Sequence, residues 1–146
     1  MVEFSRATSR RSLHPIHAML LSFALPLSLG ALISDLAYRA TFHVQWANFS
    51  SWLIAGSLFV TAFAVIWALV NIFVHRGAAA VSGGRDIAYF IALLAMWIVG
   101  LVNALIHAKD AWATMPEGLF LSVVATLLAL IASWIGFSRA RSEEGH

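Results

Sequence analysis

Two short segments of this chain of 146 residues carry side chains that are well suited to chemistry. Asn71 and His75 lie four residues apart near the end of one apolar run, and Asn103 and His107 repeat that spacing near the end of another. On a helix, this spacing places both side chains of a pair on one face. Because an imidazole binds metals and haem iron and exchanges protons near neutral pH, these segments predict ligand binding or proton transfer.

The first pair gains further polar neighbours from the start of the first apolar run. His14 and His17 are expected to meet Asn71 and His75 at one membrane surface, with Asp86 nearby. Each side of this predicted cluster therefore contributes histidines from a different segment of the chain.

The second pair is expected to form a similar cluster at the opposite surface. Asp35 and His43 are predicted to gather there with Asn103, His107 and Asp110. Asp35 lies within the end of an apolar run, and an ionisable side chain inside a membrane span indicates a function by default.

Paired histidines from different segments are typical of a six-coordinate haem b, whose two axial nitrogens approach the iron from opposite faces. The sequence predicts one haem held by His17 with His75 and a second held by His107 with an outer partner such as His43. Such a subunit would exchange electrons with a redox partner protein or a quinone. A metal ion held by imidazole and carboxylate, and proton transfer through Asp35 and the histidines, are the alternatives.

Structural roles also account for these residues. His75 and His107 lie at predicted helix C-termini, where an imidazole can satisfy unpaired carbonyl groups. The two asparagines are suited to hydrogen bonds between helices. Asp35 can pair with Arg39 one helical turn later. A structural or assembly subunit is therefore a further interpretation.

The elements that position these residues are four stretches without Asp, Glu, Lys or Arg. They run from Ser12 to Ser34, from Ala40 to His75, from Ile87 to Ala108 and from Gly118 to Ser138. Each can hold the roughly 20 apolar residues that a helix needs to cross ~30 Å of hydrocarbon. We predict an all-α, integral membrane four-helix bundle over residues 14–138, with helices at about 15–38, 49–75, 86–108 and 117–138. Residues 1–13 and 139–146 are predicted to be the N-terminal segment and the tail.

Composition supports this class and excludes others. Hydrophobic residues make up 61% and charged residues 11% of the chain, and the mean hydropathy is +0.85, values that exclude a water-soluble monomer. The net charge of +2 is too small and too dispersed for a nucleic-acid-binding face. Without cysteine, the chain has no disulfide, thiolate nucleophile or covalently attached haem. The sequence also has no phosphate-binding loop and no nucleophile beside a base. It therefore contains no motif for a particular enzymatic reaction, and whether the protein is an enzyme stays open.

The distribution of basic residues predicts the orientation in the membrane. Positively charged residues favour the cytoplasmic side of short loops, so we predict that both termini are cytoplasmic. This orientation leaves only Arg39 and Lys109 outside and places the following residues inside: Arg6, Arg10, Arg11, Arg76, Arg85, Arg139 and Arg141.

Small residues follow one face of the last predicted helix. A stripe of this kind lets two helix backbones approach closely, either within one protomer or in a homo-oligomer. Its members are Gly118, Ser122, Ala125, Ala129, Ala132 and Gly136.

Several segments together resemble a known bacterial family of predicted membrane proteins, domain of unknown function 2231. The segments are His14-Pro-Ile-His17, Leu25-Pro26 through Ser34-Asp35 to Tyr38, His107 through Asp110 to Trp112, and Gly118 to Ser122. The resemblance covers about residues 12–138 and implies a four-helix protein of the bacterial inner membrane without an established activity. The predicted function is a small electron-transfer subunit that binds haem b or a metal. The alternatives are a proton-coupled transporter in which Asp35 and the histidines titrate, and a structural subunit.

Overall fold

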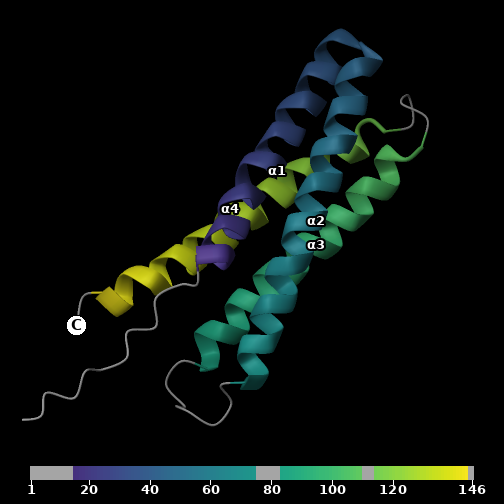
Figure 1. Cartoon of the computed structure of the whole chain (residues 1–146). Helices are drawn as coiled ribbons and strands as arrows, with labels where there is room; N and C mark the ends of the chain where they lie inside the picture. The colour runs from purple at the N-terminus through teal and green to yellow at the C-terminus, as the bar shows by residue number, and fades with distance from the viewer. Residues whose placement is uncertain (1–14, 75–82, 110–113, 145–146) are drawn as a thin grey trace, which may run out of the picture.

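The computed structural model describes residues 15–74, 83–109 and 114–144, which form four helices and no strand (Figure 1). The helices are α1 (Pro15–Thr41), α2 (Val44–Val74), α3 (Gly83–His107) and α4 (Glu117–Glu144). All four are long and apolar enough to cross a membrane. The predicted all-α membrane bundle is therefore confirmed.

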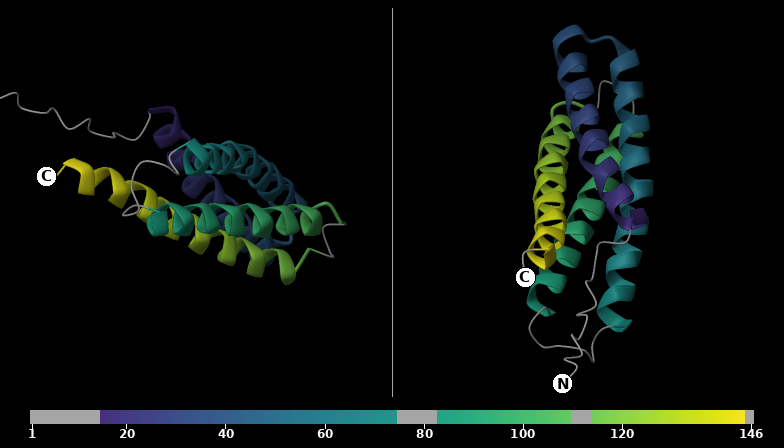
Figure 2. Two further views of the ribbon diagram at one scale, coloured as in Figure 1. Left: turned by 90° about the horizontal axis from the view of Figure 1, so that it is seen from below. Right: turned by 60° about the vertical axis from the view of Figure 1, so that its left-hand side comes forward.

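The helices form two antiparallel hairpins that pack face to face. In the left view of Figure 2, α1 and α2 form one layer and α3 and α4 form the other. α1 packs against α2 and α4, and α3 packs against the same two helices. The α1–α2 turn, the end of α3 and the start of α4 consequently lie toward the same end of the bundle.

The first connection is shorter than the sequence predicts. α1 continues to Thr41 and α2 begins at Val44, so the turn consists only of Phe42 and His43. Phe42 has a φ of 55° and donates its N–H to the Tyr38 carbonyl at 2.7 Å, which is the left-handed arrangement that ends many helices. The predicted loop before Phe49 was wrong because this stretch contains no Gly or Pro and continues as helix.

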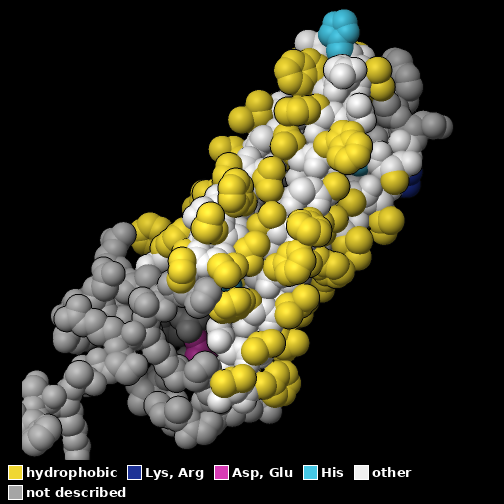
Figure 3. All heavy atoms as spheres, in the orientation of Figure 1, with side chains coloured by type: hydrophobic (Ala, Val, Ile, Leu, Met, Phe, Trp, Pro, Cys, Tyr) yellow, Lys and Arg dark blue, Asp and Glu magenta, His cyan; other side chains and the backbone are white. Residues whose placement is uncertain are grey.

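The outside of the bundle is apolar, as a bilayer requires. Large hydrophobic side chains such as Phe59, Phe63 and Phe73 are exposed on the surface of the protein. Figure 3 shows hydrophobic side chains over the length of one face, with the few visible charged side chains toward its ends. Contact with lipid accounts for this surface.

The inside of the bundle is built largely from small residues. The predicted stripe of small residues on α4 is buried against the other helices, with Ala129 and Ala132 fully buried. Gly136 lies so close to α1 that a Cβ there would collide with the Leu21 side chain. Because lipid offers little hydrophobic drive between helices, such close packing is a main source of their association.

Candidate functional site

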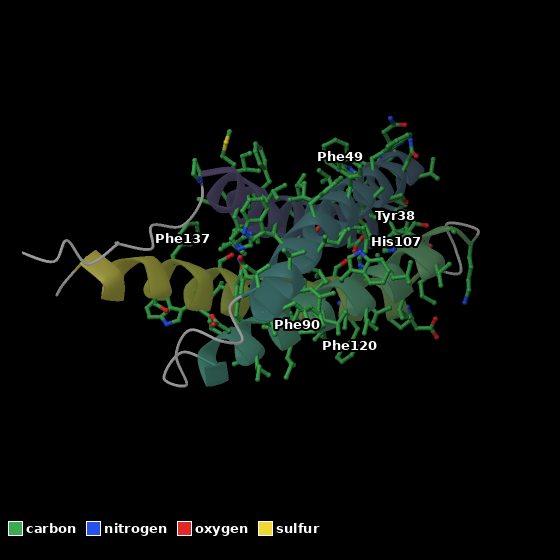
Figure 4. All side chains as sticks on the ribbon, turned by 60° about the horizontal axis from the view of Figure 1, so that its bottom comes forward. Tyr38, Phe49, Phe90, His107, Phe120 and Phe137 are labelled. Carbon is green, nitrogen blue, oxygen red and sulfur yellow. The ribbon has the colours of Figure 1, made fainter. Side chains whose placement is uncertain are left out.

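An acid and an imidazole from different hairpins meet inside the bundle. The carboxylate Oδ1 of Asp35 on α1 lies 2.9 Å from Nε2 of His107, the last residue of α3. Asp35 is 0% exposed and His107 is 9% exposed. Figure 4 shows His107 inside the bundle, toward the end where Tyr38 lies. We call these two residues the acid–imidazole pair.

The other two helices complete a hydrogen-bonded network around the pair. The Ser122 hydroxyl on α4 donates to Asp35 Oδ2 at 2.5 Å, and Asn103 Nδ2 on α3 donates to Ser122 Oγ at 2.8 Å. The Ser50 hydroxyl on α2 lies 3.4 Å from His107 Nε2 and donates to the Ala31 carbonyl at 3.2 Å. The polar network therefore consists of Asp35, Ser50, Asn103, His107 and Ser122, with a contribution from every helix.

Helical spacing explains how these side chains come together. Asp35 continues a buried stripe of α1 that includes Ser28, Ala31 and Tyr38, three or four residues apart. Asn103 and His107 are one turn apart on α3, as the repeated motif predicts.

A glycine makes room for the imidazole on the remaining side. A Cβ at Gly118, in the first turn of α4, would lie 2.8 Å from His107 Cε1 and 2.8 Å from Thr114 Cγ2. Only a residue without a side chain allows α4 to pass His107 at this distance.

The hydrogen-bond partners define where protons reside. His107 Nδ1 lies 3.0 Å from the Asn103 carbonyl oxygen, which can only accept, so Nδ1 carries a hydrogen. A second hydrogen lies between Nε2 and Asp35 Oδ1. The pair is therefore either an imidazolium with a carboxylate or a neutral imidazole with a carboxylic acid.

Both arrangements leave the pair without net charge. Neutrality suits a buried position, because an unpaired charge in a region of low dielectric is strongly disfavoured. Ser50 and Ser122 favour the imidazolium with a carboxylate: Ser50 presents a lone pair toward Nε2, and Ser122 donates to Asp35.

Polar contacts continue from the network toward the middle of the bundle. Ser28 and Ser57 lie 3.1 Å apart, and Thr126 donates to the carbonyl groups of Ser28 and Ser122. Beyond them the interior becomes apolar, first around Ala24, Met96 and Ala129 and then around Leu21, Leu93 and Ala132. The described interior thus has a polar half that contains the pair and a largely apolar half toward the other end.

A smaller aromatic group surrounds the histidine near the start of α1. His17 Nε2 lies 2.8 Å from the Tyr89 hydroxyl on α3, and the His17 ring stacks on Trp67 of α2 with the centroids 5.9 Å apart. Tyr89 and Trp67 are partners that the sequence does not predict for this histidine.

The remaining predicted site residues lie either outside the described part of the chain or on its surface. His14, His75 and Asp110 lie outside the described residues. Asn71 and His43 are exposed, and His43 forms part of the α1–α2 turn. Arg39 was one structural partner considered for Asp35, and the described ion pair of Asp35 is with His107.

Sequence reasoning missed several members of these two groups. The sequence marks Ser122 only as a small residue of the α4 stripe, and it predicts no role for Ser50, Tyr89 or Trp67. A polar residue within a stripe of small buried residues, as at Ser122, is the signal that could have identified it. The interhelical hydrogen bond of Asn103 agrees with the structural role expected of it.

Two cofactor interpretations can be compared with these contacts. Within residues 15–74, 83–109 and 114–144, no three His, Asp or Glu side chains lie close enough to hold a metal ion. An axial haem ligand needs a free imidazole nitrogen. His107 engages both ring nitrogens with protein partners, so ligation would require one of these buried contacts to break.

Comparison with known proteins gives one match. The sequence model of a family of predicted membrane proteins, DUF2231, matches residues 13–145, which is nearly the whole chain. No curated protein and no solved structure matches the chain.

Proposed function

The chain belongs to the predicted membrane protein family DUF2231, and we propose that this member is a proton-coupled membrane protein. Its acid–imidazole pair takes up and releases a proton as the bundle changes conformation. The observation that supports this proposal is the 2.9 Å contact between Asp35 Oδ1 and His107 Nε2 inside the bundle. Ionisable side chains buried within membrane spans are typical of proton relays.

Loss of one proton provides a physical switch. With both protons present, Asp35 and the Asn103 carbonyl each receive a hydrogen from the His107 ring. When one proton is lost, one of the two ring nitrogens of His107 becomes a hydrogen-bond acceptor. If Nε2 loses it, two acceptors face each other at Asp35. If Nδ1 loses it, two acceptors face each other at the Asn103 carbonyl. Two acceptors in contact repel each other, and the site also gains a negative charge. Deprotonation therefore weakens either the contact between α1 and α3 or the contact of His107 with the Asn103 carbonyl of its own helix.

The position of the pair suggests that protons exchange with one side of the membrane in this conformation, and release to the other side requires the change of conformation. His107 ends α3, and the next residues, Ala108 and Lys109, are exposed. In the other direction, apolar side chains separate the polar network from His17 and Tyr89, the next described groups that could carry a proton. With the predicted orientation, the exchanging side is the outside of the bacterial inner membrane.

Proton flux through purified protein in liposomes tests the proposal. The full chain is reconstituted with a pH-sensitive dye inside, and a potassium gradient with valinomycin imposes a membrane potential. We expect dye acidification above that of empty liposomes, and we expect Asp35→Asn to reduce the rate to the empty-liposome value. His43→Gln is the matched control, because His43 is an exposed histidine at the same end. Equal rates for the wild type and Asp35→Asn would refute the proposal.

Haem b binding by the histidines, with electron transfer to a partner or a quinone, stays a prediction. The protein contacts of both His107 ring nitrogens favour proton chemistry over it. An absorption spectrum of the purified protein, oxidised and then reduced with dithionite, decides between them. A Soret band that disappears in His107→Gln would replace the proton proposal with the redox one.

A further inference from the structure

A small cavity lies beside the polar network, toward the centre of the bundle. All four helices contribute to its wall, and the polar side chains that line it are Ser28, Ser57, Thr61, Asn103 and Ser122. The space open to the centre of a water-sized sphere is about 20 Å³. A single water needs roughly 10–15 Å³ by this measure, so the cavity has room for one.

Two buried polar atoms at this cavity lack a hydrogen-bond partner among the described residues. They are Asn103 Oδ1 and Thr61 Oγ1, and each residue is only 1% exposed. Buried polar groups in proteins nearly always have a partner, which is often an ordered water. These two atoms therefore indicate a small polar ligand.

The direction of the network explains why the amide oxygen of Asn103 faces the cavity. Ser122 has one hydroxyl hydrogen, which it donates to Asp35 Oδ2. Ser122 Oγ can therefore only accept from Asn103, so the NH₂ group of Asn103 must face Ser122. The amide oxygen consequently points to the other side and needs a donor there.

We propose that the cavity binds one water molecule, which donates to Asn103 Oδ1 and bonds to Thr61 Oγ1. This water holds the Asn103 amide in the orientation that donates to Ser122. Asn103 thus acts as a positioning residue, and the water connects Thr61 of α2 to the polar network.

Thermal unfolding of two variants in mild detergent tests the site, because the proposal predicts whether the midpoint temperature of unfolding falls or rises. Thr61→Val keeps the side-chain shape and removes the hydroxyl. If a water bridges Thr61 and Asn103, this substitution removes a hydrogen bond and lowers the midpoint temperature. If the hydroxyl has no partner, removal of a buried unpaired group raises the midpoint and overturns the proposal.

Ser133→Ala is the matched control for this measurement. The Ser133 hydroxyl is also buried without a partner among the described residues, but it lines a groove between α1 and α4 rather than the cavity. We expect its removal to leave the midpoint unchanged or to raise it. An equal fall for both variants would show a general effect of hydroxyl loss and would overturn the water site.

A high-resolution structure of the full chain, crystallised without sodium, gives the second measurement. The proposal requires density within hydrogen-bond distance of both Asn103 Oδ1 and Thr61 Oγ1, and its loss in Thr61→Val. Density that appears only when sodium is present would assign a cation site and overturn the water. Neither measurement depends on proton flux, so the water site and the proposed function can fail separately.

Discussion

Gly118 lies against the imidazole of His107, with no space between them for a side chain. A Cβ at Gly118 would lie 2.8 Å from His107 Cε1, well inside van der Waals contact. The acid–imidazole pair therefore depends on a residue of α4 that makes no hydrogen bond to it through a side chain.

Gly118→Ala is expected to displace the His107 ring from Asp35. Overpacking of this kind costs about 1–3 kcal/mol, although alanine favours the helix by up to ~1 kcal/mol. We expect a lower unfolding midpoint and a loss of Asp35-dependent proton flux. Gly84→Ala is the control, because a Cβ there meets nothing within 4 Å. If Gly118→Ala and Gly84→Ala have the same unfolding midpoint and the same proton flux, the contact of Gly118 with His107 is not required for function.

A double-mutant cycle measures the coupling within the pair. Removal of one partner from a buried ion pair costs about 3–5 kcal/mol, because the other is left without compensation. We expect Asp35→Asn and His107→Gln to be strongly destabilising alone and clearly non-additive together, with a coupling of about 0.5–3 kcal/mol. Denaturant unfolding of the four proteins in one detergent supplies the values. Additive effects would show that the two residues do not act as a pair.

Tyr89→Phe examines the aromatic group around His17. The substitution removes the hydroxyl that lies 2.8 Å from His17 Nε2 and keeps the ring, so we expect a loss of about 1 kcal/mol. Because Trp67 stacks on His17, its environment should also change, which tryptophan fluorescence detects in a variant that retains Trp67 alone. An unchanged midpoint would show that this hydrogen bond does not contribute to stability.

Single cysteines determine the orientation in the membrane. The chain contains no cysteine, so an introduced one is the sole target for a thiol reagent. With both termini inside, His43→Cys should react with a membrane-impermeant maleimide on intact cells, and Gly84→Cys should react only after permeabilisation. The opposite pattern would reverse the predicted orientation.

Sequence patterns predicted the four spans well because long apolar runs report the membrane directly. The site was harder to predict, and the reason lies in packing. Asp35 and His107 were identified as candidates, but their direct contact depends on the crossing of two hairpins, which no local spacing encodes. Ser50 belongs to the network because the packing of α2 against α3 brings its hydroxyl to His107.

The acid–imidazole pair lies between a membrane surface and the apolar half of the interior, and this position has an electrical consequence. A full transmembrane crossing of one charge is worth about 2.3 kcal/mol per 100 mV. A proton that moves from the water to Asp35 crosses only part of that voltage. Occupancy of the pair would therefore respond to membrane voltage as well as to pH, with a steepness that reports how deep Asp35 lies in the electric field.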